Sequence, residues 1–377
     1  GSEMCIRDSH IAFAENVAAV MENMVEIKPT TMISVPRLFE KIHSRVHEGV
    51  NQASPLKKRL FHRAIDVGRK YVTRKYVTKE PLGVLKFQYR FYDKLVFRKI
   101  REHFGGRLRY FICGGAPLDK TINEFMWAIG LPVYNGYGLT ETSPAVTLIN
   151  AYEVRFDSVG KLLKDTEAKL AEDGELLVKG PQVTKAYYKD EAATREAFED
   201  GWFKTGDIAR IDEEGFVYIL DRKKELIITA GGKNIAPQPI ENELKLDKYI
   251  SQAYVYGDRK PYLVALLTPN LERLIDFAKE ESIRYIDIAE LVQRNNIMDL
   301  FAERVAEKNR LFPIYQTIKY FAVLPHEFTI EGGELTPTLK LKRRVIIDKY
   351  RDIIEGLYHR DESRVIGQPS KNNGGRI

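Results

Sequence analysis

The first part of the chain alternates helical patterns with short apolar segments. Residues 108–113 (LRYFIC) have the composition of a buried strand, and a helix is predicted at 119–129, before a second short strand at 132–135. Each strand runs into a glycine-containing turn, and ligands of open α/β sheets bind at the carboxyl ends of the strands. The pattern predicts an α/β sheet over residues 10–142.

From residue 143 onward the chain changes to short strands of alternating polarity. One pair of strand patterns, at 168–170 and 175–178, encloses the dipeptide Asp-Gly, and a second pair, at 208–211 and 216–220, encloses Glu-Gly. Such dipeptides between alternating segments are hairpin signals. An antiparallel β subdomain is therefore predicted over residues 143–221.

A charged run after Asp221 is predicted to mark the boundary to a small α+β domain at residues 222–367. This segment holds three strand patterns and several helical patterns, with a final helix after Lys340. Neither end of the chain is assigned to these domains. Residues 1–9 (GSEMCIRDS) do not lead into the helical pattern that follows, so they are interpreted as a non-native, adapter-encoded tail, and residues 368–377 are predicted to be disordered.

Composition narrows the class of protein. Hydrophobic residues make up 44% and charged residues 30% of the chain, which is typical of a globular protein. The two cysteines, Cys5 and Cys113, cannot form a disulfide framework, and no apolar run approaches the length of a spanning helix. A soluble protein of the reducing cytoplasm is expected.

Positive charge is concentrated in residues 56–101, which contain fifteen Lys or Arg against three Asp or Glu. In the same stretch apolar residues recur every three or four positions, namely Leu85, Tyr89, Tyr92, Val96 and Ile100, which predicts an amphipathic helix. The favoured interpretation is a core-packed helix with a solvated basic back. The alternative is peripheral contact with an anionic membrane surface, at the inner face of the membrane. No nucleic-acid-binding motif accompanies the charge, so no nucleic acid partner is expected.

Four separated motifs carry the chemistry. They are GGAPL at 114–118, YNGYGLTET at 134–142, GWFKTGD at 201–207 together with DRKKELI at 221–227, and LTPTLK at 335–340. In this order they resemble the AMP-forming acyl-CoA synthetases, also called adenylate-forming ligases. The wording of 221–237 (DRKKELIITAGGKNIAP) and 334–344 (ELTPTLKLKRR) is most similar to bacterial long-chain fatty acid CoA ligases.

The resemblance, which runs from about residue 10 to 367, implies a fold and a reaction. The fold would be the C-terminal part of a large adenylate-forming domain, an α/β sheet with an antiparallel β subdomain, followed by a small mobile α+β domain. The reaction would activate a long-chain fatty acid with ATP and Mg²⁺ to an acyl-adenylate, which CoA then opens, with release of pyrophosphate and AMP.

The resemblance also assigns nucleotide-binding roles. Thr140 would hydrogen-bond the α-phosphate and Glu141 would hold Mg²⁺. Tyr137, followed by Gly138, would stack on adenine. The backbone that lines the base would come from Gly115, Ala116 and Pro117. Without the resemblance, Tyr137 and Gly138 could be a plain turn, and Glu141 could be a surface acid at the start of a helix.

Further roles fall on the later motifs. Asp207 would accept the ribose hydroxyls with Arg222 nearby, although Asp in a TGD turn is often only a turn former. Lys340 would bridge the substrate carboxylate and the α-phosphate and so offset the repulsion between two anions. Alternatively, Lys340 is only one more solvated charge in a basic run, without a catalytic role.

The hinge about which the small domain swings would be Lys224. Gly231 and Gly232 would let the pantetheine of CoA pass close to the backbone, or they form only a hairpin turn. Glu241 is expected to anchor a loop of the small domain without a catalytic role.

One family feature is missing from the sequence. The Ser/Thr/Gly-rich loop ending in Lys, which grips the β- and γ-phosphates of ATP, does not occur, and neither does a Walker-type loop. The chain is therefore interpreted as N-terminally truncated and impaired in ATP turnover. Two alternatives stay open: a fatty acyl-AMP ligase that loads a carrier protein, and a non-catalytic nucleotide-binding fragment.

Overall fold

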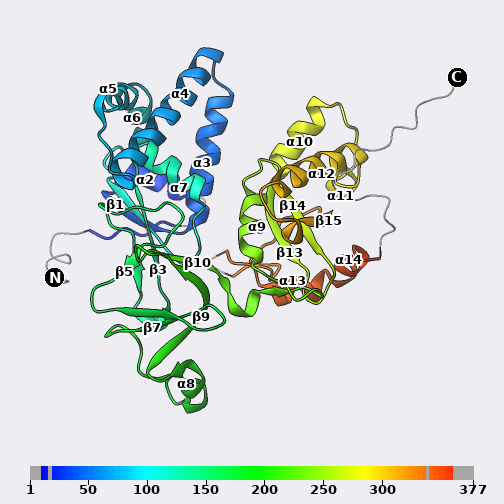
Figure 1. Ribbon diagram of the computed structural model, residues 1–377. Helices are drawn as coiled ribbons and strands as arrows, with labels where there is room; N and C mark the ends of the chain where they lie inside the picture. Colours follow the sequence, from blue (N-terminus) through cyan, green and yellow to red (C-terminus); the bar gives the residue numbers. More distant parts are fainter. Residues whose placement is uncertain (1–9, 16–18, 337–338, 360–377) are drawn as a thin grey trace. The chain divides into compact units, whose positions relative to one another are not determined.

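The computed structural model describes residues 10–15, 19–336 and 339–359 (Figure 1). The expectations for residues 1–9 and 368–377 lie outside these ranges. The chain divides into two compact units. The first unit consists of Gly1–Ala171, Leu176–Thr205 and Arg210–Ile219, and the second of Glu172–Glu175, Gly206–Ala209 and Leu220–Ile377. The predicted domain boundary after Asp221 stays a prediction.

The first unit is built on a mixed sheet. Three parallel strands, β1 (Thr31–Ser34), β2 (Tyr110–Cys113) and β3 (Val133–Tyr137), are followed by the short antiparallel strands β4 (Thr147–Leu148) and β5 (Lys161–Leu162). The predicted strands at 108–113 and 132–135 are confirmed, but β3 runs on through Gly136 and Tyr137, which were expected to form a turn. Pairing with β4 extends the strand, since Gly136 lies opposite Leu148 and Tyr137 opposite Thr147.

Helices cover this sheet (Figure 1). They are α2 (Val20–Ile27), α3 (Pro36–Asn51), α4 (Pro55–Val72) and α7 (Lys120–Ala128). Helix α7 packs against α3 and α4, and Gly68 permits the close approach because a Cβ there would lie 2.9 Å from the Ala128 carbonyl oxygen. The core contains fully buried aromatic rings such as Phe39, Phe111 and Phe125.

The predicted amphipathic helix exists. It consists of α5 (Gly83–Tyr92), a π-helical turn at Asp93–Phe97 and α6 (Arg98–Glu102), and another π-helical turn follows α4 at Thr73–Val77. The predicted apolar face, Leu85 to Ile100, is the partly buried one. Its packing includes the stacking of Tyr89 on Tyr71 with the ring centroids 4.0 Å apart.

A second sheet carries the strands of the predicted antiparallel subdomain. Its order is β10 (Val217–Arg222), β9 (Trp202–Ile211), β7 (Glu175–Lys179) and β6 (Glu167–Leu170), with β8 (Phe198–Glu199) paired to β9 and helix α8 at Glu191–Ala197. The hairpin at Asp173-Gly174 is confirmed by the antiparallel register of β6 and β7. Strand β9 begins much earlier than predicted, so Asp207 lies within a strand and not in a turn.

The second unit has a three-stranded core sheet in the order β13 (Ile250–Tyr256), β14 (Leu263–Pro269) and β15 (Ile318–Val323). Every residue of the central strand β14 is buried, because apolar clusters form on both faces of the sheet. The helices of this unit are α9 (Pro237–Lys245), α10 (Leu271–Glu280), α11 (Ile288–Leu291), α12 (Asn295–Asn309), α13 (Arg343–Lys349) and α14 (Arg351–Gly356).

Helix α9 begins at Pro237, where the missing N–H costs nothing in the first turn. Strand β15 was not predicted. Throughout the described ranges, no helix combines the length and the apolar character needed to cross a membrane.

Candidate functional site

The loop after β2 holds the first group of predicted site residues. Gly114 donates its N–H to the Ser34 carbonyl oxygen at 3.3 Å, and Gly115 then adopts a φ of +84°, which favours glycine. Gly115, Ala116 and Pro117 therefore sit at the carboxyl end of a parallel strand, ahead of helix α7. Asp119 begins that helix by accepting from the Thr121 N–H at 2.7 Å.

The end of β3 holds Tyr137 and Gly138. The Tyr137 carbonyl oxygen accepts from the Val146 N–H at 2.8 Å, which extends the pairing with the returning chain. A Cβ at Gly138 would lie 1.7 Å from the Pro144 carbonyl oxygen. Only glycine fits this position, so Gly138 has a packing role whether or not a nucleotide binds.

Thr140 and Glu141 lie in a single 3₁₀ turn, Thr140–Thr142. The buried Thr142 holds the turn: its hydroxyl accepts from the Leu139 N–H at 2.8 Å and lies 3.0 Å from the Leu139 and Pro144 carbonyl oxygens. This arrangement leaves Thr140 exposed and Glu141 partly exposed. The motif thus presents the two residues that the resemblance assigns to phosphate and metal.

Glu141 has a partner that the sequence did not indicate. The Tyr187 hydroxyl donates to Glu141 Oε1 at 2.9 Å, and the Thr184 N–H donates to the Glu141 carbonyl oxygen at 2.7 Å. Burial together with the neighbouring carboxylate raises the pKa of Tyr187. Tyr187 is 46 residues from Glu141 along the chain, so no local spacing reveals the pair.

Glu141 offers one partly exposed carboxylate as a ligand for Mg²⁺. Within the described parts of the chain, no group of three or more His, Cys, Asp or Glu side chains could hold a metal ion. Mg²⁺ usually binds one or two carboxylates and completes its coordination with substrate phosphates and water. A single partly exposed carboxylate, oriented by a tyrosine, fits that requirement.

Asp207 and Arg222 lie together in the second unit. Asp207 is 3% exposed, and its Oδ1 lies 3.0 Å from Nε of the more exposed Arg222. A buried carboxylate requires such a partner because burial penalises an isolated charge. The pair confirms the expectation that Arg222 is near Asp207.

Glu175 and Lys223 support the strand just before Asp207, and neither was predicted. Glu175 is 5% exposed and accepts from the Gly206 N–H at 2.8 Å. Its other oxygen lies 2.7 Å from Lys223 Nζ, which also contacts Asp173 at 2.5 Å. Hydrogen bonds to Asp173 and Glu175 raise the pKa of Lys223, and the bond from Lys223 lowers that of Asp173.

Lys224, the predicted hinge, is exposed in a short 3₁₀ turn at Lys223–Glu225. The residue before this charged run is firmly held. Asp221 is 1% exposed and accepts from the Arg222 N–H at 2.7 Å and from the Gln238 N–H at 3.1 Å, near the start of α9. Burial raises the pKa of Asp221 to about 6.

Gly231 and Gly232 form the tip of a small hairpin between β11 (Ile227–Ile228) and β12 (Asn234–Ile235). Gly232 has a φ of +73° and donates to the Thr229 carbonyl oxygen at 2.9 Å. Gly231 and Gly232 therefore do form a hairpin turn, which was the structural alternative. The predicted contact with CoA remains a prediction.

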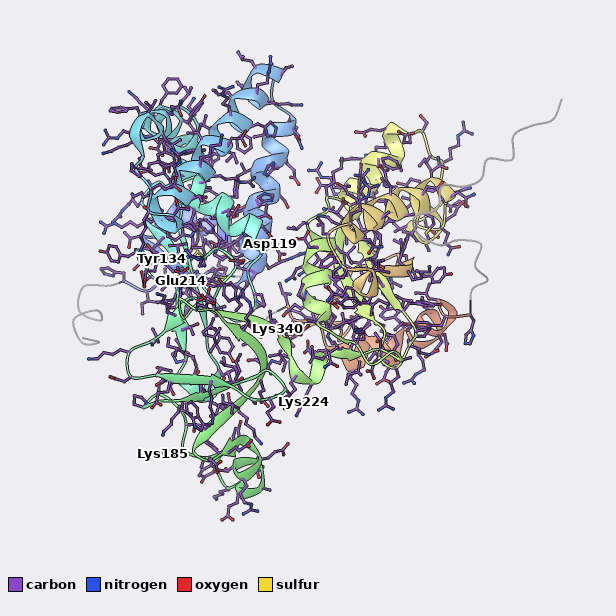
Figure 2. All side chains as sticks on the ribbon, viewed as in Figure 1. Asp119, Tyr134, Lys185, Glu214, Lys224 and Lys340 are labelled. Carbon is purple, nitrogen blue, oxygen red and sulfur yellow. The ribbon has the colours of Figure 1, made fainter. Side chains whose placement is uncertain are left out.

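Lys340 is exposed on a loop of the second unit, as Lys224 is on its turn (Figure 2). Its N–H donates to Thr336 Oγ1 at 3.0 Å, and its carbonyl oxygen accepts from the Thr336 N–H at 2.8 Å. The pKa of Lys340 is lowered by desolvation and by the charge of Arg222, while Asp207 and Glu225 oppose the shift. Lys340, Arg222 and Asp207 are thus electrostatic neighbours. The motif residues 337–338 lie outside the described ranges.

Arg343 anchors the segment that carries Lys340. Its guanidinium contacts Glu241 Oε2 at 2.8 Å and Glu225 Oε2 at 3.1 Å. Glu241 is 4% exposed and also accepts from the Val255 N–H at 2.9 Å. The anchoring role expected for Glu241 is therefore visible, although the partner Arg343 was not foreseen.

Two families match the chain. Residues 1–188 match the family described as AMP-binding enzyme, and residues 224–362 match the AMP-binding enzyme C-terminal domain. Together these matches include all of the predicted site residues except Asp207 and Arg222.

Among curated proteins, the long-chain-fatty-acid–CoA ligase FadD15 of Mycobacterium tuberculosis is 36% identical over 352 residues, which cover 93% of this chain and 58% of the relative. The human long-chain-fatty-acid–CoA ligase ACSBG1 is 32% identical over 379 residues, which cover 93% of this chain and 52% of the relative. The chain thus spans about half the length of the curated relatives it matches.

Solved structures show the same fold. The adenylation domain of a carboxylate reductase from Mycobacterium chelonae has a TM-score of 0.68 at 23% identity, covering 91% of this chain and 48% of that one. The o-succinylbenzoate CoA synthetase of Bacillus subtilis has a TM-score of 0.55 at 22% identity, covering 87% and 53%. The predicted α/β fold of adenylate-forming proteins is confirmed.

Proposed function

Because the chain belongs to the AMP-binding enzyme family, we propose that its protein activates a long-chain fatty acid with ATP and transfers it to CoA. The carboxylate attacks the α-phosphate and displaces pyrophosphate, and the thiol of CoA then displaces AMP from the acyl-adenylate. The observation that carries the proposal is the 36% identity to a long-chain-fatty-acid–CoA ligase over 93% of the chain.

The second unit would supply charge for the first step. Asp207 would offer a carboxylate to the ribose hydroxyls, and Arg222, whose Nε lies 3.0 Å from Asp207 Oδ1, would orient it. Lys340 would place its ammonium group between the fatty acid carboxylate and the α-phosphate. Adenylation brings two anions together, so a preorganised cation stabilises the transition state more than the separated reactants.

The first unit would supply the base and phosphate contacts. Tyr137 would stack on adenine, with the backbone of Gly115, Ala116 and Pro117 along its edge. Thr140 would donate to the α-phosphate, and Glu141 would hold Mg²⁺, which neutralises phosphate charge when bound. Tyr187 would orient the Glu141 carboxylate through its hydrogen bond.

The acceptor of the acyl group is proposed to be CoA. The loop at Gly231 and Gly232 supports this choice, since a backbone without side chains leaves room for the pantetheine arm. Lys224 would be the residue about which the small domain turns between the two steps. Product analysis with CoA or an acyl carrier protein as acceptor separates this proposal from a fatty acyl-AMP ligase.

The proposed setting follows from the substrates. ATP and CoA are cytoplasmic, and long-chain fatty acids partition into membranes, so we place the protein in the cytoplasm with residues 56–101 in contact with the inner membrane surface. The interpretation that the chain alone turns over ATP poorly stays a prediction. ATP–pyrophosphate exchange by this chain tests it and also separates an enzyme from a non-catalytic nucleotide-binding fragment.

The decisive variant is Lys340→Ala. Loss of one transition-state contact of this kind costs about 2.7–4 kcal/mol, so adenylation falls about 100- to 1000-fold. Acyl transfer from supplied acyl-adenylate should survive, because Lys340 would act only in the first step. The exposed neighbour Lys342→Ala is the matched control and should retain both steps. Equal loss of both half-reactions in Lys340→Ala would refute the assignment.

A further inference from the structure

The outward face of helix α5 and its continuation carries an exposed apolar stripe. Val84 is 72% exposed, Phe87 69%, Phe91 60% and Leu95 39%. The spacing of three or four residues places these side chains on one face of the helix. The solvated basic back expected for this helix is exposed, and the same face also presents two phenylalanine rings.

The stripe cannot turn inward, because the opposite face of the helix is already packed. Tyr89 stacks on Tyr71 of α4, and Phe97 is fully buried. Arg101 contacts Asp93 at 2.6 Å and the Ile129 carbonyl oxygen at 2.8 Å. Packing thus fixes the rotation of the helix and leaves the phenylalanines outside.

A basic row runs beside the apolar stripe. Lys86, Arg90 and Lys94 each precede an apolar residue of the stripe by one position, so the two rows run side by side along the helix. All three are exposed, and none forms an ion pair with any residue that the structure describes. Their charge remains available to an external anion.

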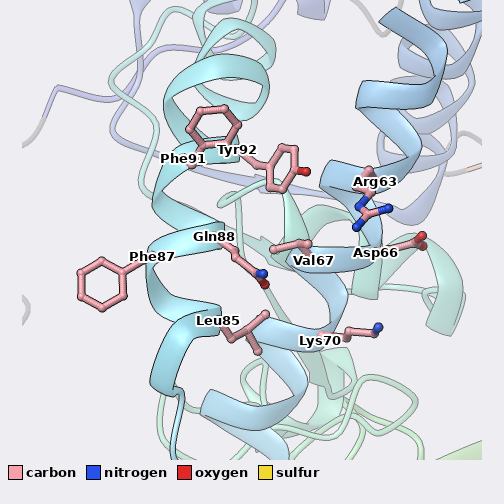
Figure 3. A pocket seen from close by; sticks show the side chains of 9 residues that line it. All are labelled: Arg63, Asp66, Val67, Lys70, Leu85, Phe87, Gln88, Phe91 and Tyr92. Atoms are coloured by element: carbon pink, nitrogen blue, oxygen red, sulfur yellow. The ribbon is translucent and has the colours of Figure 1, made fainter. Parts of the chain in front are cut away.

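Further cations lie across a hollow of about 720 Å³ between α4 and α5. Arg63 and Lys70 of α4 line this hollow together with Leu85 and Gln88 of α5, and Figure 3 shows the ring of Phe87 pointing away from α4. Phe87 and Phe91 line the same hollow as these two cations.

We propose that this face, Val84, Phe87, Phe91 and Leu95 with the row Lys86, Arg90 and Lys94, docks on an anionic lipid bilayer. The phenyl rings enter the boundary between headgroups and acyl chains, and the cations lie at the lipid phosphates. A second copy of the chain is disfavoured as occupant because two such faces carry the same charge. The inference narrows the membrane contact proposed for residues 56–101 to one helix face and rests on that part of the proposed function.

Vesicle co-sedimentation tests the proposal without ATP, fatty acid or CoA, so the result is independent of ligase activity. The chain should bind vesicles of phosphatidylglycerol and phosphatidylcholine and bind pure phosphatidylcholine vesicles far more weakly. The variant Phe87→Ser/Phe91→Ser should lose at least about tenfold in partitioning, since two apolar side chains no longer insert. Lys86→Gln/Arg90→Gln/Lys94→Gln should lose about fivefold per charge.

The matched control is Tyr152→Ser/Tyr188→Ser, two aromatic residues that are 83% and 87% exposed elsewhere in the first unit. It should bind vesicles like the parent. Phe87→Trp gives an independent reading: its emission should shift to the blue on anionic vesicles and be quenched by brominated lipids, whereas Tyr188→Trp should show neither effect.

Several results would overturn the proposal. Unchanged vesicle binding in the double serine variant would mean that the phenylalanines do not insert. Loss of vesicle binding in the charge variant alone would indicate a polyanion site. Dimers that form without vesicles and disappear in the serine variant would indicate that the face binds a second copy of the chain. Binding lost instead in Lys57→Gln/Lys58→Gln/Arg59→Gln would keep the wider membrane contact and reject this face.

Discussion

The charge cluster around Arg343 yields the sharpest stability prediction. Its guanidinium pairs with Glu241 at 2.8 Å and with Glu225 at 3.1 Å, and it lies over the Tyr254 ring at 5.3 Å. Arg343→Met keeps much of the apolar stem but removes the charge. Glu241, only 4% exposed, then keeps the Val255 N–H as its one remaining partner in the described chain.

The cost follows from the burial of Glu241. Breaking a buried ion pair by removing one partner costs about 3–5 kcal/mol, because the other charge stays uncompensated in a medium of low polarity. Each kcal/mol lowers the melting temperature of a domain of this size by about 2–4 °C, so we expect a fall of about 10 °C. Because Arg343 follows Lys340 by three residues, adenylation should fall as well.

Urea unfolding followed by circular dichroism measures the change in the free energy of unfolding. The double variant Glu241→Gln/Arg343→Met should recover part of the loss, since a neutral amide tolerates burial better than a carboxylate. The exposed neighbour Arg344→Met is the matched control and should change stability by less than about 0.5 kcal/mol. A loss in Arg343→Met that is no larger than in this control would refute the reasoning.

Three further predictions concern the hinge, acid stability and packing. Lys224→Pro, which locks φ, should spare adenylation and sharply reduce acyl transfer to CoA; equal rates of both half-reactions by stopped flow would place the hinge elsewhere. Burial alone would raise the pKa of Glu334, but hydrogen bonds from Lys349, Thr329 and Tyr350 lower it from 4.5 to about 2. Glu334 therefore adds stability that is present above pH 4.5 and lost as the pH falls towards 2. In Glu334→Gln the free energy of unfolding should depend less on pH within that range. Gly138→Ala should destabilise by more than about 2 kcal/mol in urea unfolding, whereas Gly49→Ala, with open space around it, should be neutral or stabilising.

Local pattern was enough to predict much of the secondary structure. The strand at 108–113, the helix at 119–129 and the hairpin at Asp173-Gly174 follow from local composition and turn residues, which act over a few positions. Strand β9 was predicted too short, because its first half, including Gly206, belongs to a motif with turn-forming residues. Pairing with neighbouring strands overrides that local preference.

The motifs located the candidate site, but the contacts that support its residues could not be predicted from the sequence. Motif spacing indicated Thr140, Glu141 and Asp207, whereas their supports come from distant positions. Tyr187 reaches Glu141 across 46 residues, and Glu175 reaches the Gly206 N–H across 31. Hydrogen bonds of this kind depend on chain folding, which periodicity does not encode.

The sequence alone determined that an amphipathic helix runs from Leu85 to Ile100 and that positive charge gathers over residues 56–101, because both properties are local. Only the tertiary structure decided which apolar residues of that helix are covered. Leu85 and Tyr89 meet α4, while Phe87 and Phe91, equally apolar, face outward. A helix has one surface available to the core, and the neighbouring helix, not hydrophobicity alone, selects it.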